Sequence, residues 1–436
     1  FFCVNSRKIK HGDIFVAIKG LRVDGHDFLQ EVISLGAKGI IISESRKDVI
    51  SKLTEDQKKF LFIAVVKDPE KALIELATAW RLKFEIPVVG ITGSIGKTST
   101  KQMLSNICQI SGLSYIAAEG NQNTALLTSL NILKITSEHK VAIFELGISK
   151  IGEMAKIAHI IKPTIGVITY IGHSHMEGLG SLSDIASEKR EIFKYFKDNN
   201  IGIINGDQPV LSAISYNHPI VKFGYKMTNQ VQARKLNIGS DSLDFVLKLY
   251  DKKYQIVLDT NHEARVLNAL AASAAAYILG IKPEFIIKGI AVPLAIAGRF
   301  DKKILKNGKG QIINDAYNAS PESMKAALSA FDKINFDGQK IVVLGDMLEL
   351  GINSSFWHRQ VGRFLKKVPS ITQVLLVGDL VKWTQKTAPI NVKIDHVANW
   401  QEAVKKLDEK LVKNSLVLVK ASRGMQLQKL VEEVSQ

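Results

Sequence analysis

A glycine-rich segment in the first quarter of the chain carries residue types that bind phosphate. The apolar run Val88–Thr92 leads into a turn with Gly93 and Gly96, followed at once by Lys97 and Thr98. Glycines let the backbone approach an anion, and the N–H groups that open a helix attract it. The lysine can bridge β- and γ-phosphates, and the threonine hydroxyl suits Mg²⁺. We therefore predict a phosphate loop, although its first glycine stands one residue early for the common G-x-x-x-x-G-K-[ST] spacing. A helix-starting turn with an incidental Gly-Lys-Thr is the alternative.

Two further groups of polar residues follow predicted strands and are candidates for a metal site. Glu145 ends the apolar run Val141–Glu145, where a doubly wound sheet places ligand groups, although it could equally be an exposed strand end. His173 and His175 follow the run Ile165–Tyr170. A transition-metal pair, a single imidazole on Mg²⁺ and ordinary loop histidines all fit that spacing.

Alternating strand-like and helical segments must position these residues. In the middle of the chain, apolar runs alternate with helical periodicity, which predicts a doubly wound, mostly parallel sheet with helices on both faces. The expected helices there are 98–110, 152–160, 183–196 and 266–281, and 243–258 reads as a polar stretch of short alternating runs.

The two flanking regions repeat the α/β rhythm. We expect strands at 13–18, 39–42, 341–345, 374–378 and 416–420, and helical segments at 28–35, 69–82, 322–331 and 400–411. The predicted fold class is therefore α/β with three domains: 1–85, a central 86–297 with the phosphate loop, and 298–436.

Composition and charge restrict the classes of partner that the protein could bind. The chain has 436 residues, 58 Lys and Arg against 42 Asp and Glu, and a formal net charge of +16. The excess is spread along the chain without a basic stripe, so we expect no nucleic-acid partner. No apolar run reaches the ~20 residues of a spanning helix, so no membrane insertion is expected. Two cysteines make no disulfide framework, and we expect a cytoplasmic protein.

Several segments, in order, resemble the Mur ligases of peptidoglycan synthesis. The loop resembles that family's T-G-x-x-G-K-T, which accounts for the unusual spacing. Further resemblances lie at Asn5–Arg7, Asp24–Phe28, Glu145–Gly147 with Gly152-Glu153, Ile171–Glu177, Asn314–Pro321, and Leu344–Gly351 with His358. The likeness spans nearly the whole chain. It is nearest to the branch that joins D-alanyl-D-alanine to UDP-N-acetylmuramoyl-tripeptide.

The resemblance implies roles for individual residues. Lys97, Lys189, His175 and Arg299 would be catalytic. Two Mg²⁺ ions would be held by Thr98, Glu145, His175 and Lys189, the lysine as a carbamate. ATP would be bound by Gly93, Ser94, Gly96, Lys97, Thr98, Ser99, Asn268, Arg299, Asp315, Tyr317 and Asn318. The UDP-linked substrate would be bound by Ser6, Arg7, Asp24, Gly25 and His26.

By the same resemblance, the first domain would bind the UDP substrate, the second ATP, and the third would close over ATP and bind D-Ala-D-Ala. The γ-phosphoryl group of ATP would activate the tripeptide carboxylate as an acyl phosphate, which the dipeptide amine attacks. We expect a monomer. Alternatives are the family member that adds the third amino acid, a folylpolyglutamate-type ligase, and a nucleotide-dependent switch or scaffold without ligase activity.

Some positions depart from the family pattern. Gly120–Asn123 keeps G-N-x-N, and His173 stands where proline is usual. Further departures are Thr124, Leu127 and Ser129 for Asn, Gly and Pro, Arg190 for Gly, Ala264-Arg265 for His-Asn, and Ala421 for Gly. We expect these changes to bear on substrate fit and the nucleotide pocket, while the residues assigned to the chemistry are intact.

Overall fold

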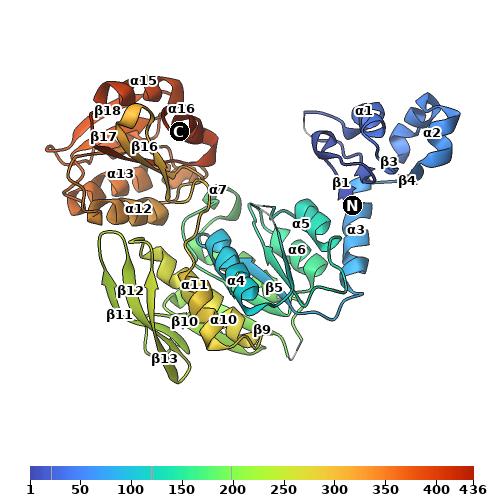
Figure 1. The fold of residues 1–436 in the computed structure, drawn as a ribbon, viewed down its shortest axis with the longest axis horizontal. Coiled ribbons are helices and arrows are strands. Elements are labelled where there is room, and N and C mark those ends of the chain that lie inside the picture. Colours follow the sequence, from blue (N-terminus) through green and yellow to red (C-terminus); the bar gives the residue numbers. More distant parts are fainter. Residues whose placement is uncertain (21, 119, 121, 198) are drawn as a thin grey trace.

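Three β-sheets follow one another along the chain in the computed structural model (Figure 1). The structure describes residues 1–20, 22–118, 120, 122–197 and 199–436. The expected α/β architecture of three parts, with a mostly parallel central sheet, is confirmed. Asn121 of the G-N-x-N segment lies outside the described residues.

The first sheet has four parallel strands in chain order. They are β1 (Phe2–Cys3), β2 (Ile14–Val16), β3 (Gly39–Ser43) and β4 (Phe62–Val66), with helices α1 (Leu29–Ser34) and α2 (Glu55–Phe60). Helix α3 (Pro69–Arg81) begins where the Asp68 carboxylate accepts a hydrogen bond from the Lys71 N–H. Leu73 of α3 packs into the core of the first sheet and Ala77 into that of the central sheet. The helix therefore joins the two domains.

The central sheet has nine strands in the order β13-β12-β11-β10-β9-β8-β5-β7-β6, and only the pairs among β11, β12 and β13 are antiparallel. They are β5 (Val88–Thr92), β6 (Tyr115–Ala117), β7 (Val141–Glu145), β8 (Ile165–Ile168), β9 (Ile201–Asn205), β10 (Ile220–Gly224), β11 (Val231–Ile238), β12 (Leu243–Leu249) and β13 (Lys252–Leu258). The chain leaves β5 toward β6 and β7 and returns on the other side at β8. Ligands bind at the carboxyl end of such a reversal point, and here that end carries the glycine-rich turn.

Helices cover both faces of the central sheet, as expected. One face packs against α4 (Lys97–Ser111), α10 (Ala264–Ile278) and α11 (Pro283–Ala291). The other packs against α3, α5 (Ala125–Ile132), α6 (Glu153–Ile161), α7 (Met176–Leu179), α8 (Leu182–Arg190) and α9 (Pro209–Ser212). The alanines of α10 from Ala269 to Ala276 are fully buried, so this helix lies close to α4 and brings its first turn beside the glycine-rich turn.

The third sheet has six strands in the order β14-β15-β19-β16-β17-β18, and only β14 and β15 pair antiparallel. They are β14 (Asp301–Ile304), β15 (Gly310–Asp315), β16 (Gln339–Gly345), β17 (Gln373–Val377), β18 (Lys393–Val397) and β19 (Ser415–Lys420). Helices α12 (Pro321–Lys333) and α13 (Ser354–Phe364) pack on one face, and α15 (Trp400–Lys410) and α16 (Leu427–Val434) on the other. The short α14 (Lys382–Gln385) contacts α13.

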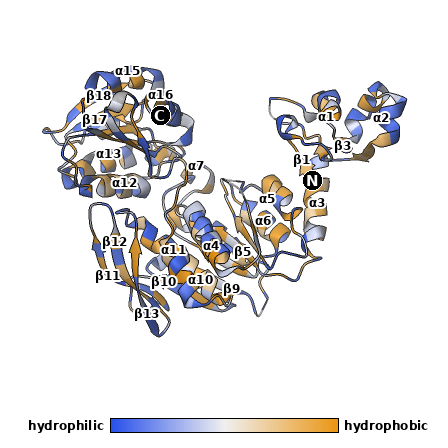
Figure 2. Cartoon of the chain, viewed as in Figure 1, coloured by the Kyte–Doolittle hydropathy of each residue, from blue (hydrophilic) through white to orange (hydrophobic). Residues whose placement is uncertain are grey.

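The helices that surround the sheets carry both hydrophilic and hydrophobic residues (Figure 2), as expected of helices with one face on a core. Within the described residues, no helix has the length and apolar content required to cross a membrane.

One expected element differs from the structure. The helix predicted over 183–196 ends at Arg190 and continues as a single 3₁₀ turn, Glu191–Phe193, because the tighter turn lets both Ile192 and Phe193 enter the core. The short alternating runs expected over 243–258 are a regular hairpin, β12 and β13, and every second residue of β12 is buried.

Candidate active site

The glycine-rich turn joins β5 to α4 and requires its glycines. Gly93 has φ +149° and Gly96 has φ +90°, conformations that favour glycine. A Cβ on Gly96 would lie 2.2 Å from the Asn268 Oδ1, and one on Gly93 would lie 2.0 Å from the Thr169 Oγ1. Side chains at these positions would therefore collide with α10 and with the segment after β8.

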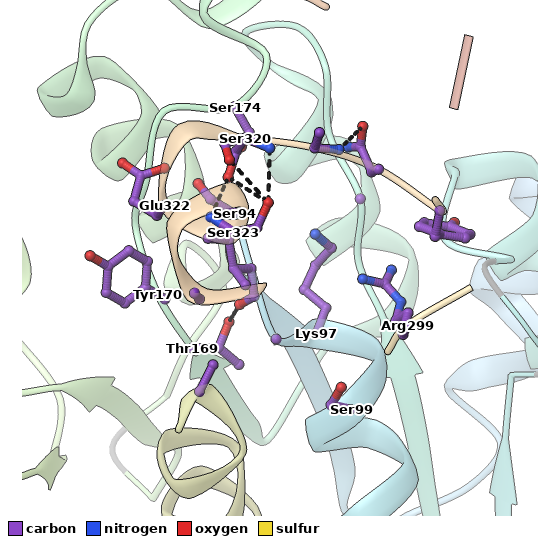
Figure 3. A pocket seen from close by; sticks show the side chains of 18 of the residues that line it. Ser94, Lys97, Ser99, Thr169, Tyr170, Ser174, Arg299, Ser320, Glu322 and Ser323 are labelled. Carbon is purple, nitrogen blue, oxygen red and sulfur yellow. Dashed lines mark hydrogen bonds between the residues drawn. The ribbon is translucent and has the colours of Figure 1, made fainter. Parts of the chain in front are cut away.

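The end of β8 fixes the shape of the turn (Figure 3). The Thr169 hydroxyl donates to the Ile95 carbonyl at 2.6 Å. The Ser94 N–H donates to the Tyr170 carbonyl at 2.7 Å, and the Ser94 hydroxyl donates to the Gly172 carbonyl at 2.9 Å. These hydrogen bonds within the protein hold the turn in shape without a bound anion. Such preorganisation lowers the free-energy cost of binding phosphate.

Lys97 opens α4 and lies over the turn. Its Nζ donates to the Gly93 carbonyl at 2.8 Å. Burial lowers the pKa of Lys97; Glu145 opposes that shift and Arg299 adds to it. Figure 3 shows Lys97 and Arg299 beside the same space, so two cations from different domains meet at the phosphate loop.

Glu145 ends β7 and is 1% exposed. Its Oε1 accepts a hydrogen bond from the Asn123 Nδ2 at 3.0 Å, while its Oε2 is buried and has no hydrogen-bond partner in the described part of the chain. Leaving a buried carboxylate oxygen unpaired is costly, so Glu145 has room for one more ligand. Sequence reasoning did not assign a role to Asn123, although the retained G-N-x-N segment contained that signal.

Lys189 lies on α8 and is 1% exposed. Burial and the charge of Lys97 hold its pKa well below its usual value, and Glu188 only partly opposes this. The Glu188 carboxylate accepts a hydrogen bond from the Met154 N–H at 2.9 Å. The environment of Lys189 therefore favours the neutral amine.

Residues of the third domain lie beside the start of α4. The Arg299 Nη2 donates to the Thr98 Oγ1 at 3.1 Å, and its guanidinium lies 4.1 Å from the centre of the Tyr317 ring. The Asp315 carboxylate pairs with the Lys420 Nζ at 2.6 Å. Asn318 accepts a hydrogen bond from the same Lys420 Nζ through its backbone carbonyl, at 3.2 Å. Thr98 of the central domain is thereby hydrogen-bonded to the third domain.

Both loop histidines face carboxylates of the third domain. The His175 Nδ1 lies 2.5 Å from a Glu349 oxygen, and this contact lowers the pKa of Glu349. The His173 Nδ1 lies 2.5 Å from a Glu322 oxygen, and its ring lies 4.1 Å from the Trp357 ring, centre to centre. Of the sequence alternatives, the transition-metal pair has no support in these contacts, since each ring contacts a different carboxylate.

Most of these residues surround one cavity of about 960 Å³. It brings together residues predicted from distant parts of the chain: Ser94, Gly96, Lys97, Ser99, Glu145, His175, Asn268, Arg299, Asp315, Tyr317 and Asn318. Gly93, Thr98 and Lys189 do not line it. Sequence reasoning missed His262 on its wall. Burial lowers the pKa of this histidine to about 4, and its Nδ1 is buried without a hydrogen-bond partner in the described regions.

The residues expected to bind the UDP-linked substrate lie in the first domain and do not line this cavity. His26 is buried, its Nδ1 lies 2.6 Å from an Asp24 oxygen, and its Nε2 accepts a hydrogen bond from the Ser43 N–H at 2.9 Å. Asp24 also pairs with Arg46 at 2.5 Å. Ser6 and the exposed Arg7 lie in a 3₁₀ turn, and Gly25 approaches the backbone of the segment after β2.

The departures from the family pattern are accommodated locally. Thr124 caps α5, Ser129 donates to the Ala125 carbonyl at 2.9 Å, and the Arg190 Nη1 donates to the Val210 carbonyl at 3.2 Å. Leu127 and Ala264 lie in the first turns of α5 and α10, and Ala421 is buried against Gly345. Arg265 contacts Ser99 and Arg299, a role that sequence reasoning did not foresee.

Comparison with known proteins agrees with the fold. Three family models match: the Mur ligase family catalytic domain over residues 1–81, the Mur ligase middle domain over 91–276, and the Mur ligase, glutamate ligase domain over 298–423. The chain belongs to the Mur ligase family.

Individual relatives give a finer comparison. The UDP-N-acetylmuramoyl-tripeptide–D-alanyl-D-alanine ligase of Bacillus subtilis is 32% identical over 99% of this chain and 92% of its own length. The solved structure of MurF from Acinetobacter baumannii has a TM-score of 0.85 at 27% identity, covering 99% of this chain and 92% of that one. MurF ligase from Thermotoga maritima in complex with ADP has a TM-score of 0.83 at 28% identity, covering 99% and 96%.

Proposed function

We propose that this chain joins D-alanyl-D-alanine to UDP-N-acetylmuramoyl-tripeptide at the expense of ATP. One observation carries the proposal: a phosphate loop from the central domain and a cation from the third domain, Arg299, face one cavity. The names of relatives that match nearly the whole chain supply the substrates. They favour this reaction over addition of the third amino acid, over a folylpolyglutamate-type reaction and over a switch without ligase activity.

The chemistry needs an activated carboxylate, since a carboxylate and an amine do not condense in water. In the proposed reaction the terminal carboxylate of the tripeptide attacks the γ-phosphorus of ATP, and the bond from that phosphorus to the bridging oxygen of ADP breaks. The dipeptide amine then attacks the acyl carbon of the acyl phosphate, inorganic phosphate leaves, and the amine loses a proton. Lys97 and Arg299 orient the transferred group and stabilise its charge.

In this proposal the central and third domains share the contacts to the nucleotide. Gly96 and Ser99 would offer backbone N–H groups to the phosphates. Ser94 would line the phosphate side of the site, and Asn268 would lie beside the base. Asp315, Tyr317 and Asn318 would complete the site from the third domain. Because the nucleotide would touch both domains, closure would exclude water from the acyl phosphate.

The residues present fit a magnesium ion. Glu145 keeps an unpaired buried oxygen, and Thr98 offers a hydroxyl. Within the described residues no group of three or more His, Cys, Asp or Glu gathers as a metal site. Mg²⁺ commonly takes one or two protein ligands with phosphates and waters, so this set suffices. Bound there, Mg²⁺ would neutralise phosphate charge; His175 and a modified Lys189 would hold a second ion.

A carbamate on Lys189 is part of the proposal. The neutral amine that burial favours can attack carbon dioxide, forming an N–C bond and releasing one proton. The product replaces a neutral amine beside Lys97 with an anion, which the Lys97 cation attracts. This change would supply the carboxylate that the described residues lack beside the second ion.

The first domain, 1–85, would bind the UDP moiety through Ser6, Arg7, Asp24, Gly25 and His26, and the dipeptide would bind to 298–436. A monomer working in the cytoplasm stays a prediction.

Phosphate release tests the proposal directly. The protein is incubated with ATP, Mg²⁺ and UDP-N-acetylmuramoyl-tripeptide, with and without D-Ala-D-Ala. We expect release to depend on both the tripeptide and the dipeptide. Release that ignores the dipeptide, or that needs a different amine, would overturn the proposed function.

A further inference from the structure

Arg265 is a buried guanidinium on the wall of the cavity. It lies in the first turn of α10, is 8% exposed and lines the same cavity as Lys97. Its Nη1 donates to the Ser99 hydroxyl at 2.8 Å, and its Nη2 donates to the Arg299 carbonyl at 3.0 Å. Both partners are neutral, and a guanidinium has five N–H donors, so donors remain for a further ligand.

No carboxylate of the described chain lies within ion-pair distance of Arg265. Asp315 is close enough to favour its charged form, but the Asp315 carboxylate already pairs with the buried Lys420. Burial and the charge of Arg299 lower the pKa of Arg265 to about 10, so it stays cationic at neutral pH. A buried cation without a counter-ion is costly, and the start of a helix makes its position worse. A bound anion would therefore supply the counter-ion of Arg265.

The contact with Ser99 indicates where that charge would sit. Lys97 and Thr98 are the positions of a phosphate loop that serve the β- and γ-phosphates and the metal. Ser99 follows Thr98 in α4, one residue beyond those two positions. We propose that Arg265 binds the α-phosphate of the nucleotide while holding Ser99 and the backbone of Arg299 in place. This inference rests on the proposed ATP-dependent function.

The position predicts a kinetic signature. The α-phosphate is present in AMP, ADP and ATP and does not change during the reaction, so its contacts stabilise ground state and transition state alike. Losing such a contact raises KM for ATP and lowers kcat/KM by the same factor. A residue that acted only through Arg299 would instead lower kcat.

Titration calorimetry with ADP and with AMP tests the proposal. For Arg265→Gln we expect Kd for both nucleotides to rise about tenfold or more, the loss of one charge-assisted hydrogen bond. Arg265→Lys keeps the charge and should recover part of the affinity. Arg363→Gln is the matched control, because Arg363 is exposed on α13 outside the cavity.

Ser99→Ala keeps the proposal testable if Arg265→Gln does not fold, because it frees the guanidinium with a small change in volume. We expect it to weaken ADP and AMP binding several-fold and equally. The inference is overturned if a folded Arg265→Gln binds ADP within twofold of the natural protein, or if its loss appears in kcat with KM unchanged. Should the natural protein itself bind no ADP, the proposed function fails instead.

Discussion

The polar cluster around His26 and the cavity around the phosphate loop differ in how their hydrogen bonds are satisfied. In the first domain both ring nitrogens of His26 have partners, and Asp24 pairs with His26 and Arg46. In the cavity, Glu145 Oε2 and His262 Nδ1 are buried without partners in the described parts of the chain. Both regions were proposed to bind a nucleotide.

The difference separates two uses of polar residues. A cluster whose polar groups all have hydrogen-bond partners holds a loop in one shape. It contributes to stability and positions neighbouring residues for a ligand. Unpaired buried groups cost stability and are kept where a ligand completes them. Four substitutions test this contrast.

Lys97→Ala should have the largest effect. It removes the loop cation, and we expect turnover to fall by more than about 10³-fold. Because the Lys97 side chain makes a single hydrogen bond within the described residues, to the Gly93 carbonyl, the fold should survive. Phosphate release measures the first expectation and thermal unfolding the second. Lys367→Ala, an exposed lysine, is the control; turnover retained in Lys97→Ala would contradict the phosphate-loop assignment.

Lys189→Ala should reduce turnover about 10²-fold, and small carboxylates such as formate or acetate should restore part of it by taking the place of the carbamate. Lys194→Ala, an exposed lysine that follows α8, should behave like the natural protein. Activity of Lys189→Ala that is normal without added carboxylate would exclude the carbamate.

His262→Gln should change how stability depends on pH. Because burial lowers the pKa of His262 to about 4, the unfolded chain takes up a proton below pH 6.5 that the folded chain refuses until about pH 4. The free energy of unfolding therefore decreases as the pH is lowered through this window, by up to about 2 kcal/mol between pH 7 and pH 5. Urea unfolding should show a smaller fall for His262→Gln than for His11→Gln, an exposed control. Equal falls would contradict the assignment.

His26→Ala should mainly affect stability. Losing its bonds to Asp24 and to the Ser43 N–H should lower the free energy of unfolding by about 1–3 kcal/mol. At saturating substrate, turnover should fall far less than in Lys97→Ala, since His26 does not line the cavity. A loss of turnover as large as that of Lys97→Ala would show that the His26 cluster takes part in the reaction, and it would contradict the difference drawn between the two regions.

The same contrast explains what could be predicted from the sequence. The strand, glycine-rich turn and helix of the predicted phosphate loop were predictable because they are adjacent in the chain, and the boundaries Val88–Thr92 and Val141–Glu145 agree with the structure. The contact from Arg265 to Ser99 joins residues 166 positions apart, and no local pattern reports it.

The two histidines show a further limit of sequence reasoning. Their spacing left several roles open, and the choice depended on Glu322 and Glu349 of another domain. The end of the helix at Arg190 depended on how Ile192 and Phe193 fit a core built from distant strands. Local pattern thus predicted the elements, and packing between domains decided the side-chain partners.

Arg299 stands at the joint between two domains, directly after Gly298, whose φ of +72° permits the sharp change of direction. Its side chain reaches Thr98 while its carbonyl accepts from Arg265, so it is attached to the central domain at two points. Rotation of the third domain about this joint would disturb both attachments. Nucleotide affinity and domain orientation are then linked quantities, and linkage is reciprocal. Any ligand that favours the closed orientation must therefore raise the affinity for the nucleotide, and the nucleotide must raise the affinity for that ligand by the same factor.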